Sequence, residues 1–289
     1  MIAAGLLFVA VTVLVRHLGS SLPAVQAAFI RYSIGLAMLV PLMFQMKWGT
    51  IGKANLGLYT LRGLFHGVAV MLWFYAMARI PIAEVTAIGY TTPIFTAVGA
   101  ILIFRERVHI RRIMAILVGF LGTLIILRPG FQEISLGSLA QLTAAPCFAV
   151  SFLFAKKLTR TENSTDILVM LSIGCTLTLL PGAIMNWHPP TWYEYGFLAL
   201  VAIFATAGHY ALTRSFACAP LTVTQPYSFL QLVWAVLLGY LLFAEVPDVW
   251  VLAGGFIIVA AITYLTHREA VANRNRRAKV TGSGGNLAG

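Results

Sequence analysis

Apolar residues come in long blocks along the chain, and short segments of charged, glycine and proline residues separate these blocks. Ten blocks lie at about 2–16, 24–45, 54–78, 82–104, 109–127, 135–155, 166–187, 192–213, 222–243 and 248–266. Roughly 20 apolar residues in a helix cross a bilayer, and a helix satisfies its own backbone polar groups in lipid. The pattern therefore predicts an all-α integral membrane protein with ten transmembrane helices.

The second half of the chain repeats the first at a constant offset of 139 positions (220 − 81 = 139). The matched pairs are Pro81 and Pro220, Leu102 and Leu241, Phe104 and Phe243, and Glu106 and Glu245. A weak internal repeat in an apolar chain is typical of transporters. We expect two units of five spans each, at residues 1–130 and 131–267. A basic and disordered cytoplasmic tail is expected at 268–289.

An odd number of spans in each unit places the two units in opposite orientations. At the turn that the units share, four arginines of the first have uncharged counterparts in the second: Arg105, Arg107, Arg111 and Arg112 match Ala244, Val246, Trp250 and Val251. Positive residues favour the cytoplasmic side, so opposite orientation accounts for their absence from the second turn. The sequence predicts an inverted five-plus-five repeat.

Composition and charge support a membrane protein. The chain is 60% hydrophobic and 10% charged, whereas soluble domains carry roughly 25% charged residues. The net charge of +11 does not indicate nucleic-acid binding, because the basic residues form short clusters between apolar blocks.

The basic clusters also predict the orientation. When successive connections are assigned to alternate sides, three basic residues fall on one side, Arg16, Arg79 and Arg128, and sixteen on the other. The sixteen are Lys47, Lys53, Arg62, Arg105, Arg107, Arg111, Arg112, Lys156, Lys157, Arg160, Arg214, Arg268, Arg274, Arg276, Arg277 and Lys279. The basic side is expected to be cytoplasmic and to hold both termini.

The ninth span is the most polar, and its polar residues form a helical stripe. Tyr227, Gln231 and Trp234 recur at i, i+4 and i+7, and Gln225 and Ser228 lie beside them. In lipid this stripe must face protein or a water-filled path. Two interpretations remain open: hydrogen bonds that join helices, or the lining of a site for a planar or zwitterionic solute.

The fourth span is the counterpart of the ninth. Thr86, Tyr90 and Pro93 lie at i, i+4 and i+7, and Thr92 matches Gln231 in the repeat. We expect the two spans to face each other across a cavity near the bilayer midplane. Pro93, Pro146 and Pro226 are expected to interrupt spans four, six and nine. Such breaks often line a cavity, although a packing kink is the alternative.

Several further residues are candidates for charge or substrate contact. Arg31 is taken as the one positive charge within a span, with snorkelling, a pair with Glu84 or substrate contact as alternatives. Glu84 is interpreted as a helix-start carboxylate or as a proton or cation site. His66 and His209 are interpreted as polar packing residues or as a proton relay. The candidate substrate-binding residues are Tyr90, Gln231, Trp234, Tyr227, Thr92, His209 and Trp73.

Motifs of enzymes and of cofactor sites are not apparent in the sequence. It has no nucleophile–base pair, phosphate-binding loop or metal-ligand spacing, and Cys147, Cys175 and Cys218 are isolated. The sequence therefore predicts no enzyme activity, no cofactor, and transport that uses a gradient or facilitated diffusion.

Several segments carry a family likeness. LRGL at 61–64, FYAMARIPIAEVTAIGYTTPIF at 74–95, RERV at 105–108 and GFLGTLIILRPG at 119–130 resemble the EamA type of the drug/metabolite transporter superfamily. The resemblance implies ten helices as two EamA units, an inner-membrane location, and transport of a small organic metabolite such as an amino acid, a vitamin or a nucleoside-like solute. A coupling proton or cation and a monomeric or homodimeric state are further expectations.

Three functions compete. A secondary carrier that works by alternating access fits the repeat best. A channel or uncoupled facilitator would need a ring of charge or a carbonyl filter, and a membrane-embedded enzyme would need converging ionisable residues. Counterflow separates a carrier from a channel, and chemical analysis of the solute exposes an enzyme.

Overall fold

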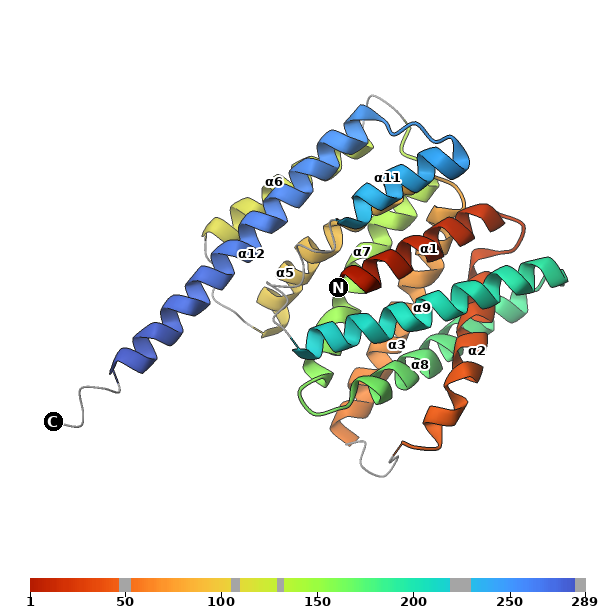
Figure 1. Cartoon of the computed structure of the whole chain (residues 1–289), viewed down its shortest axis with the longest axis horizontal. Helices are drawn as coiled ribbons and strands as arrows, with labels where there is room; N and C mark the ends of the chain where they lie inside the picture. Colours follow the sequence, from red (N-terminus) through yellow and green to blue (C-terminus); the bar gives the residue numbers. More distant parts are fainter. Residues whose placement is uncertain (47–52, 105–109, 129–132, 219–229, 284–289) are drawn as a thin grey trace.

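The computed structural model describes residues 1–46, 53–104, 110–128, 133–218 and 230–283, and every regular element in these ranges is an α-helix (Figure 1). The helices are α1 (Ile2–Leu18), α2 (Ala24–Met43), α3 (Lys53–Met77), α4 (Ile82–Gly89), α5 (Thr91–Phe104), α6 (Ile110–Leu127), α7 (Leu136–Leu158), α8 (Ser164–Met185), α9 (Trp192–Cys218), α11 (Leu230–Phe243) and α12 (Val249–Ser283). The prediction of an all-α protein is confirmed for the described chain.

Five of these helices are long and apolar enough to cross a membrane. They are α2, residues Asn55–Met77 of α3, α7, α8 and α9. Shorter apolar helices occur at Ile2–Leu18, Leu117–Leu127, Leu230–Phe243 and Val249–Ala261. The protein is therefore a multi-pass membrane protein.

The fourth predicted span is two helices. α4 ends at Gly89 and α5 starts at Thr91, with Tyr90 between them. The buried Thr91 hydroxyl donates to the Ile88 carbonyl at 2.7 Å, which holds the junction closed. Pro93 follows in the first turn of α5, where a missing backbone N–H costs little because these donors lack intrahelical partners. The predicted interruption thus lies three residues before Pro93.

The other two predicted interruptions have different outcomes. Pro146 does not interrupt α7, which continues as one helix from Leu136 to Leu158. Neighbouring helices in a membrane protein can stabilise a helix that contains proline. Pro226 lies outside the described residues.

The predicted disorder from Arg268 onward is also corrected, because α12 continues to Ser283. No glycine or proline occurs between Phe256 and Thr281, and Ala, Arg and Lys in this segment favour helix. The helix outlasts its apolar part and ends at the lower left of Figure 1.

Packing brings distant parts of the chain together. α3 packs on α7 and α8, α1 on α9, and α2 on both α8 and α9. α6 and α12 run side by side at one edge of the molecule, and α11 lies against α1 and α4 (Figure 1).

α3 and α8 approach each other closely through small residues, among them Gly63 and Gly67, which have GxxxG spacing. A Cβ atom on Gly63 would lie 2.7 Å from the Cα of Gly174 in α8, and one on Gly67 would lie 3.0 Å from Thr178. α3 and α8 therefore touch through their backbones.

Candidate functional site

A cavity of about 180 Å³ lies among α1, α3, α4, α5, α7, α9 and α11. It extends from Met1 and Gly5 at the start of α1 to Thr12, one turn or more deeper along the same helix. Both halves of the chain contribute to its walls.

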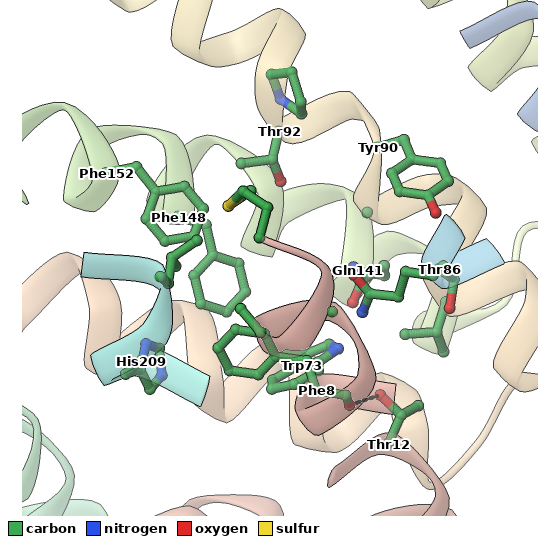
Figure 2. Close-up of a pocket in the computed structure, with 18 of the residues that line it drawn as sticks. Phe8, Thr12, Trp73, Thr86, Tyr90, Thr92, Gln141, Phe148, Phe152 and His209 are labelled. Carbon is green, nitrogen blue, oxygen red and sulfur yellow. Dashed lines mark hydrogen bonds between the residues drawn. The ribbon is translucent and has the colours of Figure 1, made fainter. Parts of the chain in front are cut away.

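One wall of the cavity is aromatic (Figure 2). The Phe8 ring meets His209 at 5.0 Å and Trp73 at 6.3 Å between ring centroids. Trp73 meets Phe148 at 6.1 Å, and Phe148 stacks on Phe152 at 5.9 Å. Edge and face contacts of this kind hold the rings in place, so the wall offers a rigid apolar surface to a planar solute.

The opposite wall carries polar groups from α4, Tyr90, α5 and α7 (Figure 2). The Thr86 hydroxyl is already used, because it donates to the Ile82 carbonyl at 2.8 Å. Gln141 differs: its side chain is 3% exposed, and its Oε1 has no hydrogen-bond partner. Its amide lies against the last turn of α4, where a Cβ on Gly89 would be 3.1 Å from Nε2. An unpartnered buried acceptor is costly.

Gln141 is the principal cavity residue that the sequence interpretation missed. The signal was an amide within the apolar stretch LGSLAQLTAAP. A lone glutamine gives no helical stripe, however, and its offset partner in the first unit is the apolar Ile2 (141 − 139 = 2).

Five of the predicted substrate residues line the cavity together, namely Trp73, Tyr90, Thr92, His209 and Gln231. The other two predicted residues have different positions. Trp234 is 40% exposed and is not part of the cavity lining. The inward face of α11 holds the buried Ala235 and Gly239, which are four and eight residues after Gln231. Trp234 is three residues after Gln231, and it therefore lies away from the centre of this face. Tyr227 lies outside the described residues.

His66 lies behind the cavity wall. Its ring packs edge-to-face on His209 with centroids 4.9 Å apart, and its Nδ1 is 2.9 Å from the Ser151 hydroxyl. His66 does not line the cavity itself, but it contacts two residues that do, His209 and Phe148, whose ring centroid is 5.1 Å from that of His66.

Arg31 and Glu84, which the sequence analysis considered as a pair, have other partners. The Arg31 guanidinium is buried 3.8 Å from the centroid of the Tyr32 ring. The Glu84 carboxylate accepts a hydrogen bond from the Ser138 hydroxyl at 2.6 Å, which joins α4 to α7.

Arg62 requires a correction. It was counted among the basic residues at the cytoplasmic ends, and Arg31 was taken as the one positive charge within a span. The structure places Arg62 inside α3, buried, with its guanidinium donating to the Ile167 carbonyl at 2.9 Å. Two arginines are therefore buried within apolar helices.

Beyond Thr12, the end of α1 is fastened to two other elements by Glu245. One carboxylate oxygen accepts from Arg16 at 2.7 and 2.8 Å, and the other accepts from the backbone N–H of Ile82 at 2.9 Å. Glu245 thus joins α1, the start of α4 and the end of α11. Its repeat counterpart, Glu106, lies outside the described residues.

A family model, described as the EamA-like transporter family, matches the chain twice, at residues 1–128 and 135–266. The chain belongs to the EamA-like transporter family. The resemblance predicted from the sequence is confirmed, and the two matched segments cover nearly all of the ten predicted spans.

Similar proteins are named transporters of different small molecules. The chain is 28% identical over 260 residues to an S-adenosylmethionine uptake transporter of Rickettsia bellii, which covers 89% of this chain and 88% of the relative. It is 29% identical over 282 residues to a riboflavin transporter of Brucella anthropi (95% and 99%). It is 26% identical over 273 residues to the pseudopaline exporter CntI of Pseudomonas aeruginosa (93% and 95%).

This EamA protein is therefore a membrane transporter of a small molecule, and not an enzyme, as the sequence predicts. A crystal structure of a protein 16% identical in sequence has a TM-score of 0.59 and covers 92% of this chain and 98% of its own. At that identity the likeness shows the fold alone.

Proposed function

We propose that this EamA protein is a secondary carrier that moves a small organic metabolite across the inner membrane by alternating access. The observation that carries the proposal is a cavity between the two family units, with one end fastened by Glu245. A carrier needs such a site at its repeat interface and a barrier that opens on one side at a time.

An inverted five-plus-five arrangement is part of the proposal, and the helix contacts support it. Matching helices in order within the two units pairs α1 with α7, α2 with α8, α3 with α9 and α6 with α12. A two-fold relation then exchanges the contact of α3 and α7 with that of α9 and α1. It likewise exchanges the contact of α3 and α8 with that of α9 and α2. All four contacts occur, and α2 also packs on its own counterpart α8, as α6 does on α12.

The orientation follows from the basic residues. With fifteen of the sixteen basic residues, all but the buried Arg62, on the cytoplasmic side, Met1 and the end of α12 are cytoplasmic, and Glu245 with Arg16 is external. The described conformation is then inward-facing, because its cavity reaches Met1 while Glu245 holds the external ends of α1, α4 and α11 together.

The solute is proposed to stack on the aromatic wall and to be oriented by amide groups. Trp73 and Phe148 supply rings, and Gln141 and Gln231 supply hydrogen-bonding groups. Pockets with apolar walls and a few placed polar groups suit small organic ligands. An amino acid, a vitamin or a nucleoside-like solute fits this description, and the named relatives transport organic molecules.

Counterflow in proteoliposomes tests the proposal. Purified protein is reconstituted with a high internal concentration of one unlabelled metabolite, and a trace of the labelled compound is added outside. Amino acids, vitamins and nucleosides are screened in turn. A carrier accumulates the label transiently and saturates with concentration. Flux that stays linear with concentration and shows no counterflow would favour a channel or facilitator instead.

A further inference from the structure

Two arginines are buried within apolar helices, and neither forms an ion pair with a described residue. Arg31 is 4% exposed and Arg62 is 3% exposed. Arginine stays protonated in proteins, and an ionised side chain in a membrane interior is costly unless it is paired or hydrated. These charges therefore require an explanation.

The acidic residues with described contacts are engaged elsewhere. Within the described chain the ion pairs are Arg16 with Glu245 and Arg128 with Asp248. Glu84 binds Ser138, Glu162 accepts from Asn55 at 2.6 Å, and Glu194 accepts from Thr191 at 2.7 Å. Asp166, which precedes Ile167, accepts from Asn163 at 3.5 Å. Among the described residues, neither buried arginine has a carboxylate partner.

The hydrogen-bonding capacity of this cluster is also unfilled. Arg62 donates to the Ile167 carbonyl, but its Nε has no partner. The Nε2 of His66 and the hydroxyl of Tyr32, whose ring stacks on Arg31, are likewise buried without a partner. Three unpartnered polar atoms in one buried cluster are more than packing alone requires.

The cluster is connected to the cavity through the histidine pair. Arg62 and His66 are four residues apart in α3, so both side chains lie on one face of that helix, and α2, which carries Arg31, packs on α3. His209 lines the cavity, and His66 packs against it at 4.9 Å. In a low-dielectric interior a charge acts over longer distances than in water, so two unneutralised cations raise the electrostatic potential of the cavity.

We propose that the cavity selects a solute that carries a carboxylate or an equivalent anionic group, and that Arg31 and Arg62 are the residues that determine this selectivity. This inference rests on the proposed carrier function. The aromatic wall holds the apolar part of the solute, and the anionic group lies toward His209. The bound anion offsets the two buried charges, which amount to a positively charged site in the empty protein.

A purely structural role for the arginines makes a different prediction. Arg62 joins α3 to the Ile167 carbonyl of α8, and Arg31 stacks on its neighbour Tyr32. If that were their whole role, removing either charge would lower stability and leave the preference between charged and neutral solutes unchanged.

Benzoate and benzamide provide a matched pair of probes, since they share one ring and nearly one size but differ in charge. Dissociation constants are measured by ligand-observed NMR on the purified full-length protein. We expect benzoate to bind roughly tenfold more tightly than benzamide. Arg62→Gln and Arg31→Gln should each bring this ratio to within about twofold of one.

Two further variants separate selectivity from folding. Arg62→Lys retains the charge but not the planar fork, so it should retain most of the preference for benzoate. Arg214→Gln removes an exposed charge at the end of α9 and should leave the ratio unchanged. Equal affinities in the native protein, no binding of either probe, or a ratio that survives both glutamine substitutions would overturn the inference.

Counterflow keeps this inference distinct from the carrier proposal. Counterflow of a solute without any preference for benzoate leaves the carrier standing and removes the anion selectivity. A preference for benzoate without counterflow of any solute removes the carrier proposal and leaves the anion selectivity of the cavity standing.

Discussion

At the scale of single residues, Gln141 is the most informative side chain of the cavity. It is buried, its Oε1 is unpartnered, and it lies beside the break between α4 and α5. In the empty protein this acceptor costs free energy, and under the proposed function it gains a partner when the solute binds. Stability and affinity are therefore expected to respond to its removal in different ways.

Gln141→Ala should weaken solute affinity while leaving stability unchanged or slightly higher. Losing a buried hydrogen-bond partner costs about 1–3 kcal/mol, or roughly 5- to 150-fold in affinity. The half-saturation concentration in counterflow and the melting temperature in detergent measure the two effects. Gln45→Ala, the same change at an exposed position after α2, is the control. Native affinity in Gln141→Ala would remove this residue from the site.

At the residue scale, the helical stripes identified several cavity-lining residues but placed Trp234 on the wrong edge, and Gln141 lay in no stripe. Thr92, Tyr90 and Gln231 were found because polar residues at helical spacing in an apolar span must face protein. Trp234 was assigned to the same stripe, but the inward face of α11 follows Gln231 in steps of four. Only the packing against α1 and α4 decides which edge of a stripe faces inward.

At the scale of elements, the contact of α3 with α8 depends on small residues. Gly63 and Gly174 leave no room for a side chain, because an added Cβ would lie within 3.0 Å of backbone atoms on either side. Backbone atoms cannot move aside as the end of a long side chain can. This contact also positions α3, which carries Trp73 and Arg62.

Gly63→Ala should therefore destabilise the protein, by about 1–3 kcal/mol as for other overpacked contacts. Gly57→Ala in the same helix has open space around its Cβ and should be neutral or stabilising by up to about 1 kcal/mol, because alanine favours helix more than glycine. Melting temperatures of the two variants in one detergent provide the comparison. An unchanged melting temperature in Gly63→Ala would show that the crossing is looser than described. A lower melting temperature in both variants would show that the effect is not specific to this contact.

The prediction that the elements are α-helices is confirmed for the described residues, but the predicted helix breaks differ where local propensity and packing disagree. Span four was expected to break at Pro93, but the helix ends at Gly89, where the chain approaches Gln141. Pro146 was expected to break α7 and does not. Proline restricts the backbone locally, and the neighbouring helices decide whether a helix ends there.

At the scale of the whole molecule, the two family units and the distribution of basic residues define the proposed topology. The 139-residue offset could be recognised in the sequence because several apolar and turn residues recur at matching positions of both units. The cavity could be predicted only in part, because its walls include α1, α3, α7 and α9 in addition to the fourth and ninth predicted spans. Those contacts join residues far apart in the sequence.

Reporter fusions test the proposed topology. A reporter joined after Lys279 should give a cytoplasmic signal, because most basic residues share its side. A reporter inserted between 128 and 135 should give an external one. The reverse pattern, or two signals from the same side, would contradict the orientation.

The carrier proposal is tested most directly by weakening the contacts of Glu245, which are proposed to close the external side. Glu245→Gln removes the charge that Arg16 binds, while an amide oxygen can still accept from Ile82. Losing one partner of a partly buried charge pair is costly, so the external side should open more often. A conformational equilibrium that gains outward-facing molecules must lose inward-facing ones.

The measurement is the labelling rate of Gln231→Cys by a membrane-impermeant thiol reagent, applied from each side, in a background with Cys147, Cys175 and Cys218 replaced by alanine. Glu133→Gln, at an exposed position on the same external side, is the control. We predict that Glu245→Gln raises the external rate and lowers the cytoplasmic rate together. If both rates rise, the pathway is a channel, and if residue 231 reacts from neither side, the cavity is not on the transport path.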